Sequence, residues 1–357
     1  MTLAFGPNHY LPVLKVKRGE KKALTLLPAE LRTRITPVLE IVERKADKTA
    51  TIEAHLDTAF KDLAASVSGY GRCLLDAREI SADGPSAAEQ VFRRASDDGI
   101  VFTPITGLSR TVDVAAALAH QSSGIALRLT REEFEGGRLT QKLQSFLSKH
   151  ALTPEGTDLV VDLGPVDDMI ADGVSKLRAA FLADVPDHVR WRTLTVSASS
   201  FPMSMSVVGR NSHGLAERSE WRTWQESLFQ NRSELERLPT FSDCAIQHPK
   251  GVEGFDPKTM PVSASIRYAL SRDWLLIKGE STRLNPPGEQ FPILATRLVY
   301  GHLRDSFLGA GHCEGCRLMK AAADHAPKLG SPEAWRRLGT IHHMSLVMDA
   351  LGSLPWP

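Results

Sequence analysis

Apolar and polar positions along this chain form blocks that predict strands and helices in regular succession. The first block is YLPVLKVKRGEKKALTLLPAELRTRITPVLEIVE, from Tyr10 to Glu43. Its apolar run at residues 11–16 is typical of a buried strand, and apolar residues recur at helical spacing over residues 20–31, where Pro28 interrupts the helix. A second branched, apolar run follows at residues 35–42. Strand, helix and strand within about thirty residues make a βαβ unit, which joins parallel strands.

The same alternation repeats to about residue 250 and gives eight strand-like runs. We predict strands at residues 11–16, 35–42, 73–75, 100–105, 125–129, 158–163, 191–197 and 241–246. Later helices are predicted at residues 52–67, 86–95, 112–121, 139–150, 169–182 and 216–229. Eight parallel strands close a (β/α)8 barrel of about 250 residues. An open doubly wound sheet is the alternative, but neither half of this region carries a GxGxxG turn.

The pattern changes after residue 250. SASIRY at residues 263–268 and WLLIK at residues 274–278 predict an antiparallel hairpin, and helices are predicted at residues 289–303 and 332–351. We therefore expect residues 1–250 to form a TIM-barrel-like α/β domain. Residues 251–357 are expected to form an α+β elaboration, a hairpin plus helices, packed on the barrel.

Composition indicates the class and location of the protein, but it does not indicate a reaction. The 357 residues are 42% apolar and carry a formal net charge of +1, so there is ample material for a core and no global attraction to nucleic acid. No apolar run approaches the roughly 18 residues of a membrane helix, and the first residues lack the pattern of a secretory signal. Four cysteines do not make a disulfide framework. A cytoplasmic protein with no membrane partner is expected.

Charged residues end several predicted strands, and barrel geometry gathers such ends at one mouth. We predict catalytic roles there for Asp76, Asp162, Asp243, Glu40 and Lys15, and ligand-binding roles for Lys17, Arg128, Arg267 and Lys278, the last two arriving from the hairpin. Such carboxylates suit general acid–base work or a divalent cation, and such bases suit a phosphate. A closed ring of salt bridges that fixes the strand register is the alternative.

A second candidate site is HCEGC at residues 312–316, with a histidine pair downstream. Cys313 and Cys316 have the spacing of a zinc knuckle, and His342 or His343 would supply a further ligand. Two alternatives remain open for this segment. The cysteines form a redox dithiol, or they are two small residues buried in a core.

Several motifs together resemble the beta protein family, which takes its name from the beta protein of the gop-beta-cII locus of satellite phages. YLPVLKVKRGEKKAL followed by RITPVLEIVE is similar to the opening of that family. Further matches are SDCAIQHP, SIRYAL with DWLLIKG, and CEGC ahead of WRRLGTIHH, so the resemblance covers nearly the whole chain.

The resemblance implies a bacterial or phage-encoded protein of an anti-phage defence locus. Such a protein would bind a partner effector encoded in the same locus and restrain or license it. The family carries no established reaction, and the chain has no Walker A, HExxH, GxSxG or protein-kinase motif. The alternative function is an enzyme acting at the barrel mouth on a phosphate-bearing substrate, a nucleotide or nucleic acid, in the manner of a phosphodiesterase or nuclease.

Overall fold

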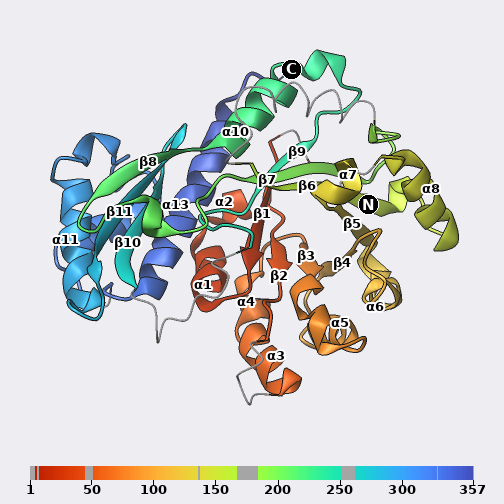
Figure 1. The fold of residues 1–357 in the computed structure, drawn as a ribbon, viewed down its shortest axis with the longest axis horizontal. Helices are drawn as coiled ribbons and strands as arrows, with labels where there is room; N and C mark the ends of the chain where they lie inside the picture. The colour runs from red at the N-terminus through yellow and green to blue at the C-terminus, as the bar shows by residue number, and fades with distance from the viewer. Residues whose placement is uncertain are drawn as a thin grey trace.

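Eight parallel strands close into a barrel, and a smaller sheet with helices packs beside it (Figure 1). The computed structural model describes residues 5, 8–44, 51–135, 137–166, 184–250, 262–327 and 329–356. The barrel strands are β1 (Tyr10–Lys15), β2 (Val38–Glu40), β3 (Cys73–Asp76), β4 (Phe102–Thr106), β5 (Ile125–Leu129), β6 (Thr157–Pro165), β7 (Thr193–Ser199) and β9 (Thr240–Asp243). They pair in that order, and β9 closes on β1. The predicted (β/α)8 barrel is confirmed, and the open sheet is wrong.

Helices connect the strands around the outside of the barrel (Figure 1). They are α1 (Arg18–Leu26), α2 (Ala29–Arg32), α3 (Ile52–Phe60), α4 (Leu63–Ser66), α5 (Ala87–Asp97), α6 (Val114–Ala119), α7 (Arg131–Glu135), α8 (Leu139–Lys149) and α10 (Ser219–Thr223). Pro28 separates α1 from α2, as predicted. The single helix predicted at residues 52–67 is two helices, because Asp62 adopts a left-handed conformation with φ of 62°. The helix predicted at residues 169–182 lies outside the described residues.

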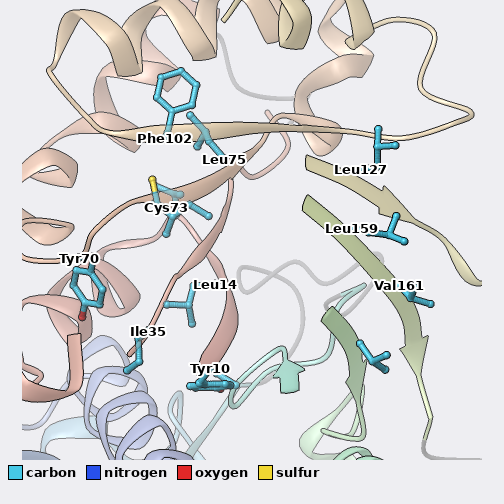
Figure 2. Packing of buried hydrophobic residues seen from close by; sticks show 14 of the residues in the cluster. Tyr10, Leu14, Ile35, Tyr70, Cys73, Leu75, Phe102, Leu127, Leu159 and Val161 are labelled. Carbon is cyan, nitrogen blue, oxygen red and sulfur yellow. The ribbon is translucent and has the colours of Figure 1, made fainter. Parts of the chain in front are cut away.

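The core has two layers, because successive residues of a strand point to opposite faces. Inward side chains fill the barrel; they are Leu11, Val13, Val38, Leu74, Ile105, Ala126, Val160 and Cys244. Outward side chains pack against the helices in a larger cluster, which Figure 2 shows around Leu14, Leu75 and Leu127. Each fully buried Leu, Ile or Val contributes about 1.5–3 kcal/mol.

The N-terminal end of the barrel is closed by a charged cluster around Asp158, the inward residue that precedes Val160 by two positions. Its carboxylate accepts hydrogen bonds from Arg192 at 2.9 and 2.7 Å, from Arg72, and from Thr193 at 2.8 Å. Burial alone would raise the pKa of Asp158, but the hydrogen bonds from Arg192 and Arg72 hold it below its usual value. Buried ion pairs therefore occupy this end of the barrel.

The smaller sheet has the order β10-β11-β8. The predicted hairpin is confirmed as β10 (Ser263–Ala269) and β11 (Asp273–Ser281). Its third strand, β8 (His213–Glu217), comes from the segment between β7 and α10 and pairs antiparallel with β11. The helix predicted at residues 216–229 is therefore wrong in its first turn: it begins at Ser219, and residues Trp224–Phe229 continue it as a π-helix.

Three further helices complete the elaboration: α11 (Pro287–Val299), α12 (Glu314–Ala323) and α13 (Pro332–Ser353). Helices α11 and α13 were predicted from the sequence, whereas α12 was not. Helix α13 contacts β10 and α12 on one side and α1 and β1 on the other, so it lies between the small sheet and the barrel (Figure 1). Within the described part of the chain, none of the helices combines the length and apolar character needed to span a membrane.

Candidate functional site

The barrel mouth is lined by the last inward side chain of five strands. Each of these charged residues follows a barrel-core residue of its own strand by two positions. Both side chains therefore point to the inner face of the barrel. The five residues are Lys15, Glu40, Asp76, Arg128 and Asp162. The structure therefore brings together five of the mouth residues predicted from the sequence.

Arg128 holds three of these carboxylates at once. Its guanidinium nitrogens lie 2.7 Å from Glu40, 2.9 Å from Asp76 and 2.6 Å from Asp162. Burial opposes the charge on Arg128, but the three acids raise its pKa well above the usual value. The guanidinium thus supplies positive charge among carboxylates for which a divalent cation was one possible partner. The alternative of a salt-bridge ring accounts for this part of the mouth.

Two further ion pairs flank Arg128. Arg110, from the loop after β4, donates to both carboxylate oxygens of Asp76 at 2.7 and 3.2 Å. Burial would raise the pKa of Asp76, but Arg110 and Arg128 hold it well below the usual range. Lys15 donates to Glu79 at 2.8 Å. Arg110 and Glu79 were not predicted, because both lie beyond the strand ends in segments without a regular period.

Glu40 differs from its neighbour Asp76. Although it is 2.7 Å from Arg128, burial raises the pKa of Glu40, and the nearby charges of Glu79 and Asp76 raise it further. Two carboxylates bound to one guanidinium therefore differ in their readiness to hold a proton. Such a difference suits a general acid.

Asp243 does not share the mouth, and its predicted place there is wrong. Its neighbours Ser242 and Cys244 take the inward positions of this segment, so Asp243 points out of the barrel. There it accepts hydrogen bonds from the Tyr10 hydroxyl at 2.5 Å and from His343 at 2.8 Å. Burial would raise the pKa of Asp243, but His343 and the two hydrogen bonds lower it.

His343 accordingly does not join the cysteines, and its predicted role as a metal ligand is wrong. It lies fully buried on α13 and faces Asp243 and Trp274, whose ring centroid is 4.9 Å away. Burial lowers the pKa of His343. The pair fastens α13 to the barrel wall, which is a structural role.

A cleft of about 630 Å³ opens between the barrel mouth and the small sheet. Its lining comes from β1, from the loop between β7 and β8, from β10 and β11, and from the start of α13. We call it the basic cleft, because seven of its described lining residues are Lys or Arg: Lys15, Lys17, Arg210, Lys250, Arg267, Lys278 and Arg336. Its described acids are Glu43 and Glu79.

The basic cleft includes predicted and unpredicted cations. Lys17, Arg267 and Lys278 lie in it as the sequence analysis expected, although Arg128 does not. Arg210, Lys250 and Arg336 were missed, because they come from loops and from a helix start rather than from strand ends. The sequence around a single basic residue in a loop does not show whether that residue lines a cleft or faces solvent.

Most of these cations lack a carboxylate partner. Lys15 pairs with Glu79, and Arg336 lies 3.7 Å from Glu20. The other five have no carboxylate within ion-pair distance in the described part of the chain; they are Lys17, Arg210, Lys250, Arg267 and Lys278. Two of these five cations form hydrogen bonds to backbone carbonyls instead. Lys278 donates to two backbone carbonyls at 2.9 Å, and Arg267 donates to Ile246 O at 2.8 Å.

The cations of the basic cleft also disfavour one another's charge. Burial, followed by the charge of Arg336, lowers the pKa of Lys17, and the same two causes lower the pKa of Arg267 to about 9. Burial, followed by Arg210, lowers the pKa of Lys278. An anion bound among these groups would favour their charged forms and so raise these pKa values again.

A second cavity of about 530 Å³ adjoins the basic cleft and reaches the Arg128 cluster. The two cavities share Glu79, Met203, His248 and Lys250. Glu40, Asp76 and Asp162 line the second one. A ligand in the basic cleft would therefore have the mouth carboxylates beside it.

The CxxC segment lies apart from the mouth, where α12 meets α13. His342 Nδ1 is 3.2 Å from Cys316 Sγ and 3.9 Å from Cys313 Sγ. His312, Cys313 and His342 place potential ligand atoms within 4.8 Å of one another, and this is the one group of that kind in the described part of the chain. The cysteines are not joined by a disulfide. Hydrogen bonding with Cys316, and then with His342, lowers the pKa of Cys313 to about 4, whereas that of Cys316 is raised.

A comparison with known proteins agrees with the resemblance noted from the motifs. No curated protein gave a match in a sequence comparison. The family model described as Beta protein matches residues 10–349 of the chain. That match begins at β1 and ends within α13, so it takes in the barrel, the basic cleft and the CxxC segment. This protein therefore belongs to the Beta protein family.

Proposed function

We propose that this protein binds a phosphate-bearing ligand of nucleotide size in the basic cleft. The observation that carries the proposal is the excess of cations, seven Lys or Arg against two Glu among the described lining residues. A cavity of about 630 Å³ lies within the range of small-molecule sites, roughly 300–1,000 Å³. It also lies at the C-terminal ends of the strands, where barrel proteins bind their ligands.

One wall of the cleft is suited to a phosphate. Ser263, Ser265 and Arg267 alternate along β10, so their side chains share the face that lines the cleft. Two hydroxyl groups beside a guanidinium fork offer the donors that a phosphate accepts, and Arg binds such an anion through two parallel hydrogen bonds.

Another wall suits the less polar part of a nucleotide. The loop after β7 contributes Pro202, Met203 and Met205 to the cleft, and Met203 is 46% exposed. Apolar lining with a few convergent charges is the usual character of a small-molecule site. We therefore expect the phosphates to lie against β10 and β11 and the base to lie against this loop.

Membership of the Beta protein family supports a biological setting for the ligand. We propose that the protein acts in an anti-phage defence locus, where the bound ligand sets whether a partner effector from the same locus is restrained or licensed. The cleft walls come from the barrel, the small sheet and the loop between β7 and β8. A ligand bridging them would fix the surface that a partner contacts.

An enzyme acting on the same ligand is the second candidate. It is favoured by Glu40, whose pKa is raised by burial and which lines the adjoining cavity. A carboxyl group that keeps its proton more readily than its neighbours is suited to protonating a leaving group, as a phosphodiesterase or nuclease requires. The same cleft would then hold substrate rather than a signal.

Calorimetric titration with ATP, AMP and inorganic phosphate tests binding. Lys17→Gln and Arg210→Gln should each weaken binding of ATP about 10-fold or more, because a hydrogen bond to a charged group contributes about 1.5–3 kcal/mol. Arg304→Gln is the matched control: it removes an exposed cation outside the cleft and should leave affinity unchanged. Absence of binding to all three probes, or binding that neither cleft variant alters, contradicts the proposal.

Glu40→Gln separates the two candidates. If the protein is an enzyme, chromatography of incubated ATP and short oligonucleotides should show products with the wild type and none with this variant. If it is a binder, the probes stay intact, and the variant keeps the defence phenotype of the locus in cells. Lys17→Gln should lose that phenotype in both cases.

A further inference from the structure

Where α12 begins beside the middle of α13, the ligand atoms of His312, Cys313 and His342 lie within 4.8 Å of one another, and Cys316 lies beside His342. Cys313 and Cys316 flank the first turn of α12, His342 faces them from α13, and His312 precedes the pair. The His342 Nδ1 atom is 3.2 and 3.9 Å from the two sulfurs, and the rings of His312 and His342 lie 5.3 Å apart.

The hydrogen bond on the far side of His342 fixes its tautomer. His342 Nε2 is 2.8 Å from the carbonyl oxygen of Ala269, which can only accept, so Nε2 carries the hydrogen. In the neutral ring Nδ1 then presents a lone pair to both sulfurs. Metal-binding histidines are held in this way, with the other ring nitrogen donating to a backbone carbonyl.

Each sulfur also lies within hydrogen-bond distance of a group that can donate to it. The Tyr268 hydroxyl accepts the amide hydrogen of Leu308 at 3.0 Å, so its own hydrogen is free to point at Cys316 Sγ, 3.5 Å away. The amide of Cys316 donates to Cys313 Sγ at 3.4 Å. Donors directed at sulfur from outside stabilise thiolates rather than thiols.

His312 supplies the remaining position. Its Nδ1 lies 3.5 Å from the carboxylate of Asp349, while its Nε2 is buried and has no hydrogen-bond partner among the residues that the structure describes. A buried ring nitrogen without a partner is costly unless something else binds it. With both cysteines as thiolates, the four side chains would offer lone pairs and no donor hydrogen, which is the ligand set that a metal cation binds.

We propose that Cys313, Cys316, His342 and His312 bind one zinc ion that fastens α12 to α13. Tetrahedral zinc with ligands at about 2.0–2.3 Å requires sulfur–nitrogen separations of about 3.5 Å. The observed separations of 3.2 and 3.9 Å bracket that value. Two thiolates with two imidazoles form a closed structural set, which zinc accepts and which leaves no position for substrate.

The glycine of the CEGC motif makes this approach of the helices possible. A Cβ atom on Gly315 would lie 2.6 Å from the carbonyl oxygen of Leu338 and 3.0 Å from the amide nitrogen of His342. Any larger residue would push α12 away from α13 and separate the sulfurs from His342. The spacing of the motif therefore serves both the ligand set and the helix contact.

The zinc site is separate from the basic cleft, because none of its four residues lines that cleft. The test uses the full chain, purified without chelator, and measures zinc per chain by elemental analysis. About one equivalent is expected in the wild type, and Cys316→Ser and His342→Gln should lower it at least 10-fold. His343→Gln and Cys244→Ser are matched controls, buried elsewhere, and should retain the metal.

Cobalt titration of metal-stripped wild type gives a second measurement that needs no variant. The expected result is a thiolate-to-cobalt charge-transfer absorption that saturates at one equivalent, together with protection of two cysteines from alkylation. Absence of stoichiometric zinc and of this absorption would overturn the proposal. Retention of zinc by both ligand variants in folded form would overturn it as well.

Discussion

Replacing Arg128 with Met tests whether one guanidinium neutralises the barrel mouth. Met has a similar length and no charge, so the change leaves Glu40, Asp76 and Asp162 without their common partner. Removing one partner of a buried ion pair costs about 3–5 kcal/mol. Arg110 stays bound to Asp76 and offsets part of the loss, so we expect a value near the lower end, about 3 kcal/mol.

The pH dependence of this loss identifies its cause. In the wild type the lowered pKa of Asp76 contributes stability that is present above about pH 4 and is lost as the pH falls through the folded pKa. In Arg128→Met the ionised carboxylates repel one another, and protonation relieves that repulsion. The gap in unfolding free energy between wild type and variant should therefore narrow from pH 7 to pH 4.

Urea unfolding followed by circular dichroism at pH 7, 6, 5 and 4 measures that gap. With an m-value of about 3 kcal/mol per molar, the midpoint at pH 7 should fall by about 1 M. Arg94→Met is the control, because Arg94 pairs with Asp57 and Asp98 near the surface and should cost about 1 kcal/mol or less. A loss under 1 kcal/mol at pH 7, or a gap that does not depend on pH, would refute the reasoning.

Two further changes test the packing of α12 and the acid sensitivity of the N-terminal end. Gly315→Ala should destabilise the protein by about 1–3 kcal/mol and weaken zinc binding, because its Cβ would lie 2.6 Å from Leu338 O; Gly311→Ala, which meets nothing within 4 Å, is the control for both readouts. Burial, followed by nearby arginine charges, lowers the pKa of His9 to about 3, so its contribution to stability is present above about pH 6.5 and is lost as the pH falls toward 3. His9→Gln should therefore flatten the decline in melting temperature between pH 6.5 and pH 4, whereas the exposed His302→Gln should not, and equal declines in both variants would contradict the assignment.

The barrel was predictable because its signal is local and repeated. Each strand-like run contains at least three apolar residues and is separated from the next by a helical period, so the count of eight follows from the sequence. Closure was preferred over an open sheet because of that count, and the structure confirms it. The residues of the barrel mouth were predicted from the charged residues at the strand ends. Lys15, Glu40, Asp76, Arg128 and Asp162 all keep the parity of the inward residues before them.

Asp243 was misplaced because its strand does not reveal that parity. Phe241 and Cys244 are both apolar and buried, yet they point to opposite faces, so the sequence does not say which face Asp243 shares. The answer depends on Tyr10 and His343, which are 233 and 100 residues away. Contacts at that separation leave no periodic pattern in the sequence.

The edge strand β8 and the basic cleft were hidden for a related reason. HGLAE is short and partly exposed, and it becomes a strand only by pairing with β11, about sixty residues later. The cleft collects Arg210, Lys250 and Arg336 from three separate segments. These three residues lie close together only when the small sheet packs against the barrel mouth.

Helix α13 reaches three features of the structure: the CxxC segment, Asp243 and the basic cleft. His342 and His343 are adjacent, so on a helix their side chains diverge by about 100°, and one reaches the cysteines while the other reaches Asp243 on the barrel. The first turns of the same helix carry Trp335 and Arg336 into the basic cleft. The hydrogen bond from His343 to Asp243 holds the middle of this helix, and the proposed zinc would hold it further, so both would keep those cleft residues in place. A ligand that needs them there would bind more tightly to the metal-loaded protein, and linkage then requires the ligand to strengthen metal binding by the same factor.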